Sequence, residues 1–418
     1  MVRKAIKMTE QRVKILWISS HAPYSSAPDA GGQTFNYYFK KISKDPRFNV
    51  VLVSLGNEKK KEEIDSELRE IEKYIISPMG TIGEKIKKLK NIDYKVNPYH
   101  KYANLISNYY GDRIIKKIRE LNNRGYIPEI IIFEWTNALV LAPQIKKIYP
   151  QAKLVASEHD VTFVGYKRKA DYYKGLKKMF WRIRYRNEKK VELSALKLCD
   201  LILPHNPDNI RLLVNEGIQE EKLQWLVPYF NNMSKCLRKP NGKDILFFGA
   251  MARPENYLSA IWFIEHVMPL IEDMNIRFVI LGSNPPKKLR EYENSKVHIT
   301  GFIDSIVPYF EQSVCLVAPL VLGAGIKVKI LEALSSGIPV ITNNVGIEGI
   351  PAEHGKEYIH CEEPNDYARA IISLFQNNKI QNTLSDNARK FIKVNYNYEK
   401  SVEEYILSLL KIADREQI

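Results

Sequence analysis

The sequence predicts an α/β protein with two open parallel sheets in tandem, and three observations carry this prediction. Its 418 residues exceed the length at which one hydrophobic core stops growing, so two domains are expected. Short apolar runs alternate with segments of helical periodicity in both halves, which is typical of parallel α/β units. A polar stretch over residues 231–244 separates the halves. Because such sheets bind ligands at the carboxyl ends of their strands, we expect an interdomain cleft to hold the site.

The first half contains five strand-like runs and one clear strand–helix unit. After the first run, Gly31 and Gly32 mark a turn, and Phe35, Phe39 and Ile42 then follow at helical spacing. This spacing predicts a helix over residues 33–44. The expected strands cover residues 13–18, 50–55, 130–133, 154–157 and 201–203.

The second half repeats this rhythm. Its expected strands cover residues 245–248, 278–281, 297–300, 314–318 and 339–342, with helices over about 256–272 and 326–335. We therefore expect an N-terminal domain over 1–232 and a C-terminal domain over 243–395. Residues 396–418 should form a last helix that returns to the N-terminal domain, because its apolar stripe needs a partner: Val402, Tyr405, Ile406 and Leu409.

Composition excludes several classes of protein. Hydrophobic residues at 45% and charged residues at 27% are globular values that exclude disorder and collagen-like chains. The longest apolar stretch, over 314–326, is too short to span a bilayer, and residues 1–14 lack a signal-peptide pattern. We expect a cytoplasmic protein. The four cysteines and eight histidines are scattered, so neither disulfides nor a metal site is expected.

The net charge of +15 is concentrated in two segments. Residues 167–190 hold eleven Lys/Arg against two acids, and residues 84–120 hold ten against four. The remaining sequence holds 42 of each and is neutral. Such local excess favours contact with an anionic surface: a membrane, a nucleic acid or an acidic polymer.

A glycine-bearing loop followed by a helix carries the most informative chemistry. The segment 323–342 contains Gly323 and Gly325, then Lys327 and Lys329, and then Glu332. Glycines let the backbone approach a diphosphate, the helix start favours an anion, and two lysines add positive charge. A carboxylate about two turns along can accept both hydroxyls of a ribose. The alternative is an ordinary glycine-rich turn with solvated lysines.

This segment resembles the donor-site signature of retaining, nucleotide-sugar-dependent glycosyltransferases of family four (glycosyl transferases group 1). These enzymes have the GT-B fold of two tandem Rossmann-like domains. Further pieces occur in the family's order: the Gly31-Gly32 turn, Ser157-Glu-His-Asp160, the stretch 247–256, Gly301-Phe-Ile-Asp304 and Tyr396-Asn-Tyr-Glu399. The resemblance covers nearly the whole chain and is weakest over 59–124.

The resemblance implies a role for each matching residue. His159 matches the active-site histidine near the transferred sugar and, with Lys327 and Lys329, forms the implied catalytic set. Glu332 matches the residue that binds the donor ribose. The other implied donor-binding positions are Gly31 and Gly32 for the distal phosphate, Thr300, Gly301 and Phe302 for the base, Gly323, Ala324, Gly325 and Ile326 for the sugar and diphosphate, and Arg253 and Asn256.

Two positions depart from the family pattern. Ala324 stands where many members have a glutamate that contacts the sugar, and a frequent basic pair falls on Ala250 and Asn256. Arg253, Lys327 and Lys329 must therefore meet the diphosphate charge. The implied retaining mechanism uses no metal and no cofactor: the leaving diphosphate accepts the proton of the acceptor hydroxyl.

The basic segment 167–190 interleaves its charges with aromatic residues. At helical spacing one side carries Lys174, Lys177, Lys178 and Arg182, and another carries Tyr173, Leu176, Phe180 and Ile183. This pattern predicts docking to the inner face of an anionic cell membrane or contact with the acceptor. The alternative is a solvated face over core aromatics. Nucleic acid is disfavoured because no recognition module accompanies the charge.

Two classes of function follow. The first is a glycosyltransferase that builds a surface polysaccharide or glycolipid from a nucleotide sugar and a glycan, lipid-linked or protein acceptor. The second is a non-catalytic sugar-nucleotide-binding subunit, or a sugar-nucleotide epimerase, on the same fold.

Overall fold

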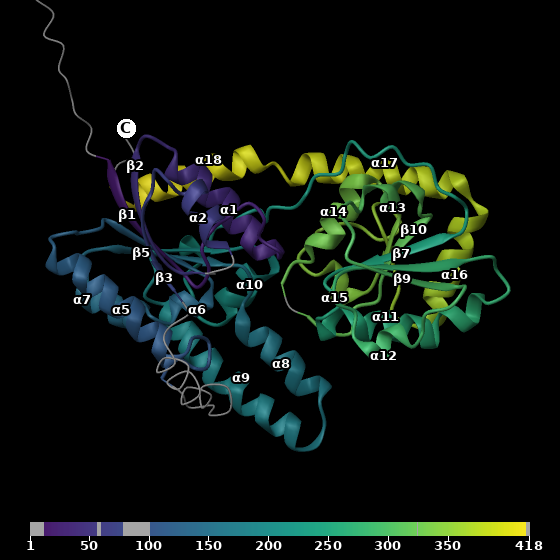
Figure 1. The fold of residues 1–418 in the computed structure, drawn as a ribbon, viewed down its shortest axis with the longest axis horizontal. Coiled ribbons are helices and arrows are strands. Elements are labelled where there is room, and N and C mark those ends of the chain that lie inside the picture. The colour runs from purple at the N-terminus through teal and green to yellow at the C-terminus, as the bar shows by residue number, and fades with distance from the viewer. Residues whose placement is uncertain (1–11, 57–59, 78–100, 324, 415–418) are drawn as a thin grey trace, which may run out of the picture. The chain divides into compact units, whose positions relative to one another are not determined.

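The computed structural model describes residues 12–56, 60–77, 101–323 and 325–414, which divide into two compact units (Figure 1). The first unit holds the chain up to His205, Asn209–Leu226 and the segment from Glu399 onward; the second holds Asn206–Asp208 and Val227–Tyr398. Each unit contains one parallel sheet of six strands. The predicted α/β fold with two tandem sheets is confirmed.

The sheet of the first unit has the order β3-β2-β1-β4-β5-β6. Its inner strands are almost wholly buried, as expected of a sheet covered on both faces. The edge strand β3 was not predicted, because its Glu-Lys-Tyr start is half exposed and lacks an apolar run. The strands are β1 (Val13–Ser19), β2 (Phe48–Leu55), β3 (Glu72–Ile76), β4 (Ile130–Glu134), β5 (Lys153–Glu158) and β6 (Leu201–Pro204).

Helices cover both faces of this sheet. The described helices are α1 (Ala30–Ser43), α2 (Lys61–Glu67), α5 (Asn108–Asn123), α6 (Thr136–Leu139), α7 (Ala142–Ile148), α8 (Thr162–Tyr172), α9 (Gly175–Leu196), α10 (Asp208–Asn215) and α18 (Tyr398–Ile412). Alternate strand residues face two separate cores. Val402, Tyr405, Ile406 and Leu409 of α18 pack into the core that contains Trp17 and the buried face of α1. The Tyr38 hydroxyl also donates to Ser401 Oγ at 2.7 Å, so the last helix is part of the first unit.

The second unit has the strand order β12-β11-β10-β7-β8-β9. All five predicted strands are present, and a two-residue sixth strand was too short to be recognised. The strands are β7 (Asp244–Phe248), β8 (Arg277–Leu281), β9 (Val297–Gly301), β10 (Cys315–Ala318), β11 (Val340–Thr342) and β12 (Ile359–His360). The helices are α11 (Pro254–His266), α12 (Lys287–Arg290), α13 (Val307–Gln312), α14 (Val328–Ser336), α15 (Asn344–Ile347), α16 (Pro364–Gln376) and α17 (Asn378–Asn395).

Two predicted helices of this unit have different limits. The helix expected over 256–272 is α11 followed by a 3₁₀ turn over Met268–Ile271. Pro269 explains the change, because proline cannot donate the amide hydrogen that an α-helix needs there. The helix expected from residue 326 begins at Val328 and stops at Gly337, whose φ of 77° is left-handed and suits glycine.

Two predictions about the whole chain can be compared with the described residues. None of their helices is both long enough and apolar enough to cross a membrane. Cys199, Cys236, Cys315 and Cys361 are all buried free thiols.

Candidate functional site

In the second unit the predicted ribose ligand Glu332 contacts Asn231, which lies near the start of the Val227–Tyr398 segment of that unit. Glu332 is buried on α14, with 7% of its surface exposed. Asn231 donates to Glu332 Oε1 from its side chain at 3.1 Å and from its backbone at 3.4 Å. Both bonds fall on Oε1, and no hydrogen bond from a described residue reaches Oε2. Burial raises the pKa of Glu332 to about 7, against the effect of the Asn231 bonds.

One turn earlier, Lys329 and Asn256 form a second contact that the sequence placed on separate motifs. Lys329 Nζ donates to Asn256 Oδ1 at 2.6 Å and lies 4.9 Å from the centre of the Phe247 ring. Asn256 Nδ2 in turn donates to the Ala250 carbonyl at 2.9 Å. Burial, with nearby Lys327 and Arg253 adding to it, lowers the pKa of Lys329 to about 7. Asn256 therefore anchors the lysine at a position where a basic residue was expected.

Lys327 lies at the N-cap of α14 and not within its first turn. Its ammonium pairs with Glu348 at 3.4 Å and donates to the Gly325 carbonyl. Gly323 has a φ of 136°, and a Cβ built on it would lie 3.1 Å from Lys327 Cε, so glycine fits this loop. Ala324 lies outside the described residues. Two half-buried lysines thus lie at the start of the helix, one paired with Glu348 and the other bonded to Asn256.

The remaining predicted donor-site residues lie on neighbouring loops of the same unit. Thr300 and Gly301 end β9, where Gly301 has a φ of 73°. The Phe302 side chain that follows is 76% exposed. Arg253 precedes α11 and accepts a backbone hydrogen bond from Asn256 at 3.0 Å. Ile326 lies half-buried before α14.

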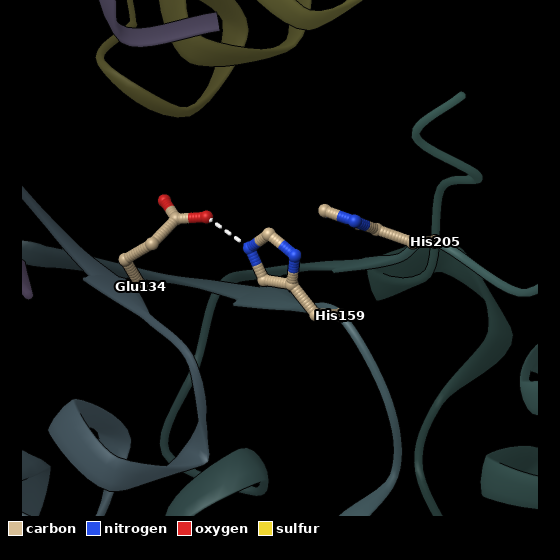
Figure 2. Close-up of side chains that lie close together, drawn as sticks. All are labelled: Glu134, His159 and His205. Carbon is tan, nitrogen blue, oxygen red and sulfur yellow. Dashed lines mark hydrogen bonds and ion pairs between the residues drawn. The ribbon is translucent and has the colours of Figure 1, made fainter. Parts of the chain in front are cut away.

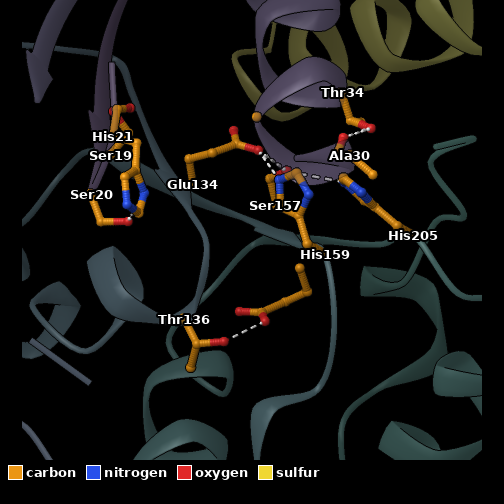
Figure 3. A network of polar contacts seen from close by, with 12 residues as sticks. Ser19, Ser20, His21, Ala30, Thr34, Glu134, Thr136, Ser157, His159 and His205 are labelled. Atoms are coloured by element: carbon orange, nitrogen blue, oxygen red, sulfur yellow. Dashed lines mark hydrogen bonds and ion pairs between the residues drawn. The ribbon is translucent and has the colours of Figure 1, made fainter. Parts of the chain in front are cut away.

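In the first unit, His159 follows β5 and lies among side chains from the ends of β4 and β6 (Figures 2 and 3). Its ring stacks on Trp135 with centres 4.7 Å apart and an interplanar angle of 20°. The ring of His205, after β6, lies 4.0 Å away on a tilted plane. The N-terminal turn of α1 also approaches: a Cβ on Gly31 would lie 3.2 Å from His159 Nδ1 and from Trp135 Nε1. Gly31 and His159, predicted on separate motifs, therefore meet.

Gly32 contributes to the same turn. Its backbone amide donates to Asp29 Oδ1 at 2.9 Å, and Asp29 is the N-cap of α1. A Cβ on Gly32 would lie 2.9 Å from the Ala27 side chain. Both glycines thus occupy positions where a side chain would crowd its neighbours.

Glu134, at the end of β4, is a site residue that the sequence did not reveal. Its Oε1 lies 2.5 Å from His159 Nε2 and accepts from Ser157 Oγ at 2.8 Å. Its Oε2 accepts from Trp17 Nε1 at 3.0 Å. Burial raises the pKa of Glu134 to about 8 and lowers the pKa of His159 to about 3. Burial, with His159 adding to it, also lowers the pKa of His205.

Glu134, His159 and His205 also offer ligand atoms that lie within 4.8 Å of one another, a spacing that a metal ion could use. No metal was expected because the three residues have no ligand spacing along the chain: they lie at the ends of three strands. Ser157 Oγ already bridges Glu134 and His205, at 3.3 Å from His205 Nε2. The three side chains therefore have hydrogen-bond partners within the protein.

The predicted basic helix is a pair of helices. The helical conformation is interrupted between α8 and α9, where Gly175 has a φ of 59°. The side that was expected to be apolar is split: Leu176 is 82% exposed, whereas Tyr173 and Phe180 are half-buried. Trp181 packs against Tyr166 and Tyr173, with ring centres 5.5 and 6.5 Å apart. The predicted bases all stay exposed: Lys174, Lys177, Lys178 and Arg182. Of the second basic segment, residues 84–100 lie outside the described residues.

Comparison with known proteins places these sites in a family context. Residues 242–377 match the family model of glycosyl transferases group 1. A Klebsiella pneumoniae protein, described as an uncharacterized 44.6 kDa protein in the cps region, is 26% identical over 168 residues, which are 38% of this chain and 43% of that protein. An uncharacterized glycosyltransferase of Methanocaldococcus jannaschii is 25% identical over 283 residues, 62% of this chain and 68% of that one.

Two solved structures share the fold of the whole chain. HepE of Anabaena, crystallised with UDP, has a TM-score of 0.66 at 12% identity, over 96% of this chain and 100% of that one. Sucrose-phosphate synthase of Thermosynechococcus elongatus has a TM-score of 0.68 at 13% identity, over 96% and 99%. The match over residues 242–377 and the shared GT-B fold together support a group 1 glycosyltransferase.

Proposed function

We propose that this protein transfers a sugar from a nucleoside diphosphate sugar to an acceptor hydroxyl, with retention of anomeric configuration and without a metal ion. The observation that supports this most is the pair of contacts on α14, Asn231 to Glu332 and Lys329 to Asn256. They put a carboxylate and a cation one turn apart, inside the stretch that matches group 1. That is the chemistry that a ribose joined to a diphosphate requires.

In the proposed reaction the bond between the sugar C1 and the diphosphate oxygen breaks, and a bond from C1 to the acceptor oxygen forms on the same face. The acceptor proton passes to the leaving diphosphate, so no protein base is needed. Lys329, Lys327 and Arg253 would stabilise the charge that develops on the diphosphate. Lys329 suits this role because its lowered pKa lets an arriving anion draw a proton onto it.

The first unit would serve the transferred sugar and the acceptor. A cavity of about 350 Å³ lies beside His159 and is lined in part by Trp135, Asp160 and Tyr166. Asn104 also lines it, and its Oδ1 is buried without a hydrogen-bond partner among the described residues. Aromatic rings with a few amide and carboxylate groups suit a polyhydroxylated acceptor, such as a glycan unit.

We further propose that the turn between α8 and α9 docks on an anionic membrane that carries a lipid-linked acceptor. Leu176 and Met179 are 82% and 57% exposed among the four exposed bases 174, 177, 178 and 182. Apolar side chains surrounded by cations are typical of segments that lie in the membrane interface. This supports a cytoplasmic protein at the inner face of the membrane, in synthesis of a surface polysaccharide or glycolipid.

The membrane proposal is tested by sedimentation with vesicles of phosphatidylglycerol. Changing Lys174, Lys177, Lys178 and Arg182 together to Gln should weaken binding by about 4 kcal/mol, at about 1 kcal/mol for each base. A matched variant that neutralises four exposed bases of the second unit, Lys287, Lys288, Arg290 and Lys296, should bind as the wild type does. If the wild type does not sediment with these vesicles at low salt, the membrane proposal fails and a soluble acceptor is favoured.

The catalytic proposal is tested with a panel of UDP-, GDP- and ADP-sugars in the presence of EDTA. UDP-sugars come first, because HepE was crystallised with UDP and with UDP-glucose. We expect release of the nucleoside diphosphate by the wild type, and release by Glu332→Gln only at higher donor concentrations. Binding without release would favour the non-catalytic subunit, and conversion of the donor to an isomeric nucleotide sugar would favour the epimerase.

A further inference from the structure

Three side chains of the first unit contact the ring of His159. Trp135 covers one face of the ring, His205 approaches from 4.0 Å, and Glu134 engages Nε2 at 2.5 Å. Nδ1 points away from Glu134 (Figure 2), toward the start of α1 at Gly31. Nδ1 is therefore the ring nitrogen that remains for a substrate.

The partners of Glu134 define which of its oxygens can carry a proton. The Trp17 indole can only donate, so Oε2 must accept. Oε1 faces His159 Nε2 and accepts from the Ser157 hydroxyl, so it has no acceptor other than Nε2 for a proton of its own (Figure 3). A proton shared by the pair must lie between Oε1 and Nε2.

The location of that shared proton does not alter the state of Nδ1. If Glu134 is neutral and donates to Nε2, the neutral imidazole carries its own hydrogen on Nδ1. If the proton has moved to Nε2, the imidazolium again carries a hydrogen on Nδ1. Only a pair with a net negative charge leaves Nδ1 bare, and a buried net charge without a counterion is costly.

The titratable groups around the pair oppose that negative state. Asp29, at the cap of α1, and Glu158, on β5, interact with His159 and Glu134. Tyr405 of α18 lies near Glu134, and burial raises the pKa of this phenol, which favours its neutral form. His205, after β6, is kept neutral by burial. Further negative charge on Glu134 would therefore face carboxyl groups and neutral rings.

We propose that Glu134 is the positioning residue of His159: it shares one proton with Nε2, and so presents Nδ1–H as a hydrogen-bond donor at the start of α1. The role of this group in the reaction rests on the proposed function. There, Nδ1–H would donate a hydrogen bond to a hydroxyl or phosphate oxygen of the sugar substrates. It assigns Trp17 and Ser157 the task of orienting the carboxyl group.

Two substitutions separate this role from simple packing. In Glu134→Gln the Trp17 indole must take the amide oxygen, so the amide nitrogen faces His159 and donates to Nε2. The Nδ1–H form is thereby kept. Glu134→Ala leaves Nε2 without its partner. Glu158→Gln is the matched control, because Glu158 is equally buried at the end of the adjacent strand and accepts instead from Thr136 Oγ1 at 2.9 Å.

The first readout needs no activity: nitrogen NMR of the full chain with ¹⁵N-labelled histidine rings, with His159 assigned from its loss in His159→Gln. We expect a protonated Nδ1 at pH 7 in the wild type, Glu134→Gln and Glu158→Gln, and a mixture of tautomers in Glu134→Ala. A bare Nδ1 in the wild type, or an unchanged His159 in Glu134→Ala, would overturn the proposal. So would one equivalent of zinc that survives dialysis of the wild type and is lost in His205→Asn.

The second readout is kinetic. Glu134→Ala should lower kcat for transfer by about 10- to 100-fold, as loss of a partner that orients a functional histidine does, with little change in the KM for the donor. Glu134→Gln should retain most of the activity. Equal losses in both variants would contradict the proposal. If the wild type turned over no nucleotide sugar, the proposed function would fail, while the NMR result would still decide the role of Glu134.

Discussion

Both units bury a glutamate, at the end of β4 in the first and on α14 in the second, but they hold it differently. Glu134 has both oxygens engaged, by Trp17 on one side and by Ser157 and His159 on the other. Glu332 accepts on Oε1 only, from Asn231. We infer that the first carboxyl group acts through a neighbouring histidine, whereas the second keeps an oxygen for a ligand. On this inference a buried glutamate serves positioning in one unit and binding in the other.

Removing the histidine should separate the two sites most clearly. His159→Ala should lower the rate of sugar transfer by about 100-fold, within the range that one positioned hydrogen-bond donor contributes, and should leave nucleoside diphosphate affinity nearly unchanged. Initial rates and calorimetric titration with UDP measure the two effects. Equal losses of rate and affinity would mean that the first unit does not specialise in the transferred sugar.

Changing the glutamate of the second unit should have the opposite profile. Glu332→Gln should weaken nucleoside diphosphate binding by about 1–3 kcal/mol, the worth of a hydrogen bond to a charged group. Glu357→Gln is the matched control, since Glu357 is also buried in this unit and accepts from the backbone of Glu353 at 2.7 Å. Unchanged affinity in a folded Glu332→Gln variant would remove Glu332 from the donor site.

The pH dependence of donor affinity sharpens the description of the second site. Lys329 and Glu332 both have a pKa of about 7 in the free protein. Below pH 7 the ribose must expel a proton from Glu332, so affinity should rise with pH; above pH 7 the diphosphate must draw a proton onto Lys329, so affinity should fall. Each limb should change by up to about tenfold per pH unit.

We therefore expect a maximum of donor affinity near pH 7. Glu332→Gln should remove the acid limb, and Lys329→Met the alkaline limb. Calorimetry in buffers of different ionisation enthalpy would detect the proton release and uptake directly. A flat profile in the wild type would show that neither group changes its protonation on binding.

The candidate residues of the second unit are more readily recognised from the sequence than those of the first, for a physical reason. Lys327, Lys329 and Glu332 lie close together at the start of one helix, so spacing along the chain defines their geometry. Their partners Asn231, Asn256 and Glu348 come from elsewhere. The pair of Glu134 and His159 spans 25 residues and two strands. Glu134 ends an apolar run and carries no local signal. Its role becomes visible only when the parallel register sets Glu134 beside Ser157.

In the fold, too, local sequence patterns predicted some elements and missed others. Apolar runs identified the buried strands, because burial on both faces requires such runs. They missed β3 and β12, of which one is half exposed and the other has two residues. Helical spacing alone placed Leu176 on an apolar face, but the break at Gly175 leaves Leu176 in solvent.

In the proposed reaction the sugar moves from donor to acceptor on one face of its ring, with the leaving diphosphate as the proton acceptor. The most direct test is the anomeric configuration of the first transfer product, read from proton NMR coupling at C1 before any mutarotation. We predict the configuration of the donor, formed at full rate in EDTA. A product with inverted configuration, or a reaction that stops when metal is removed, would contradict the account.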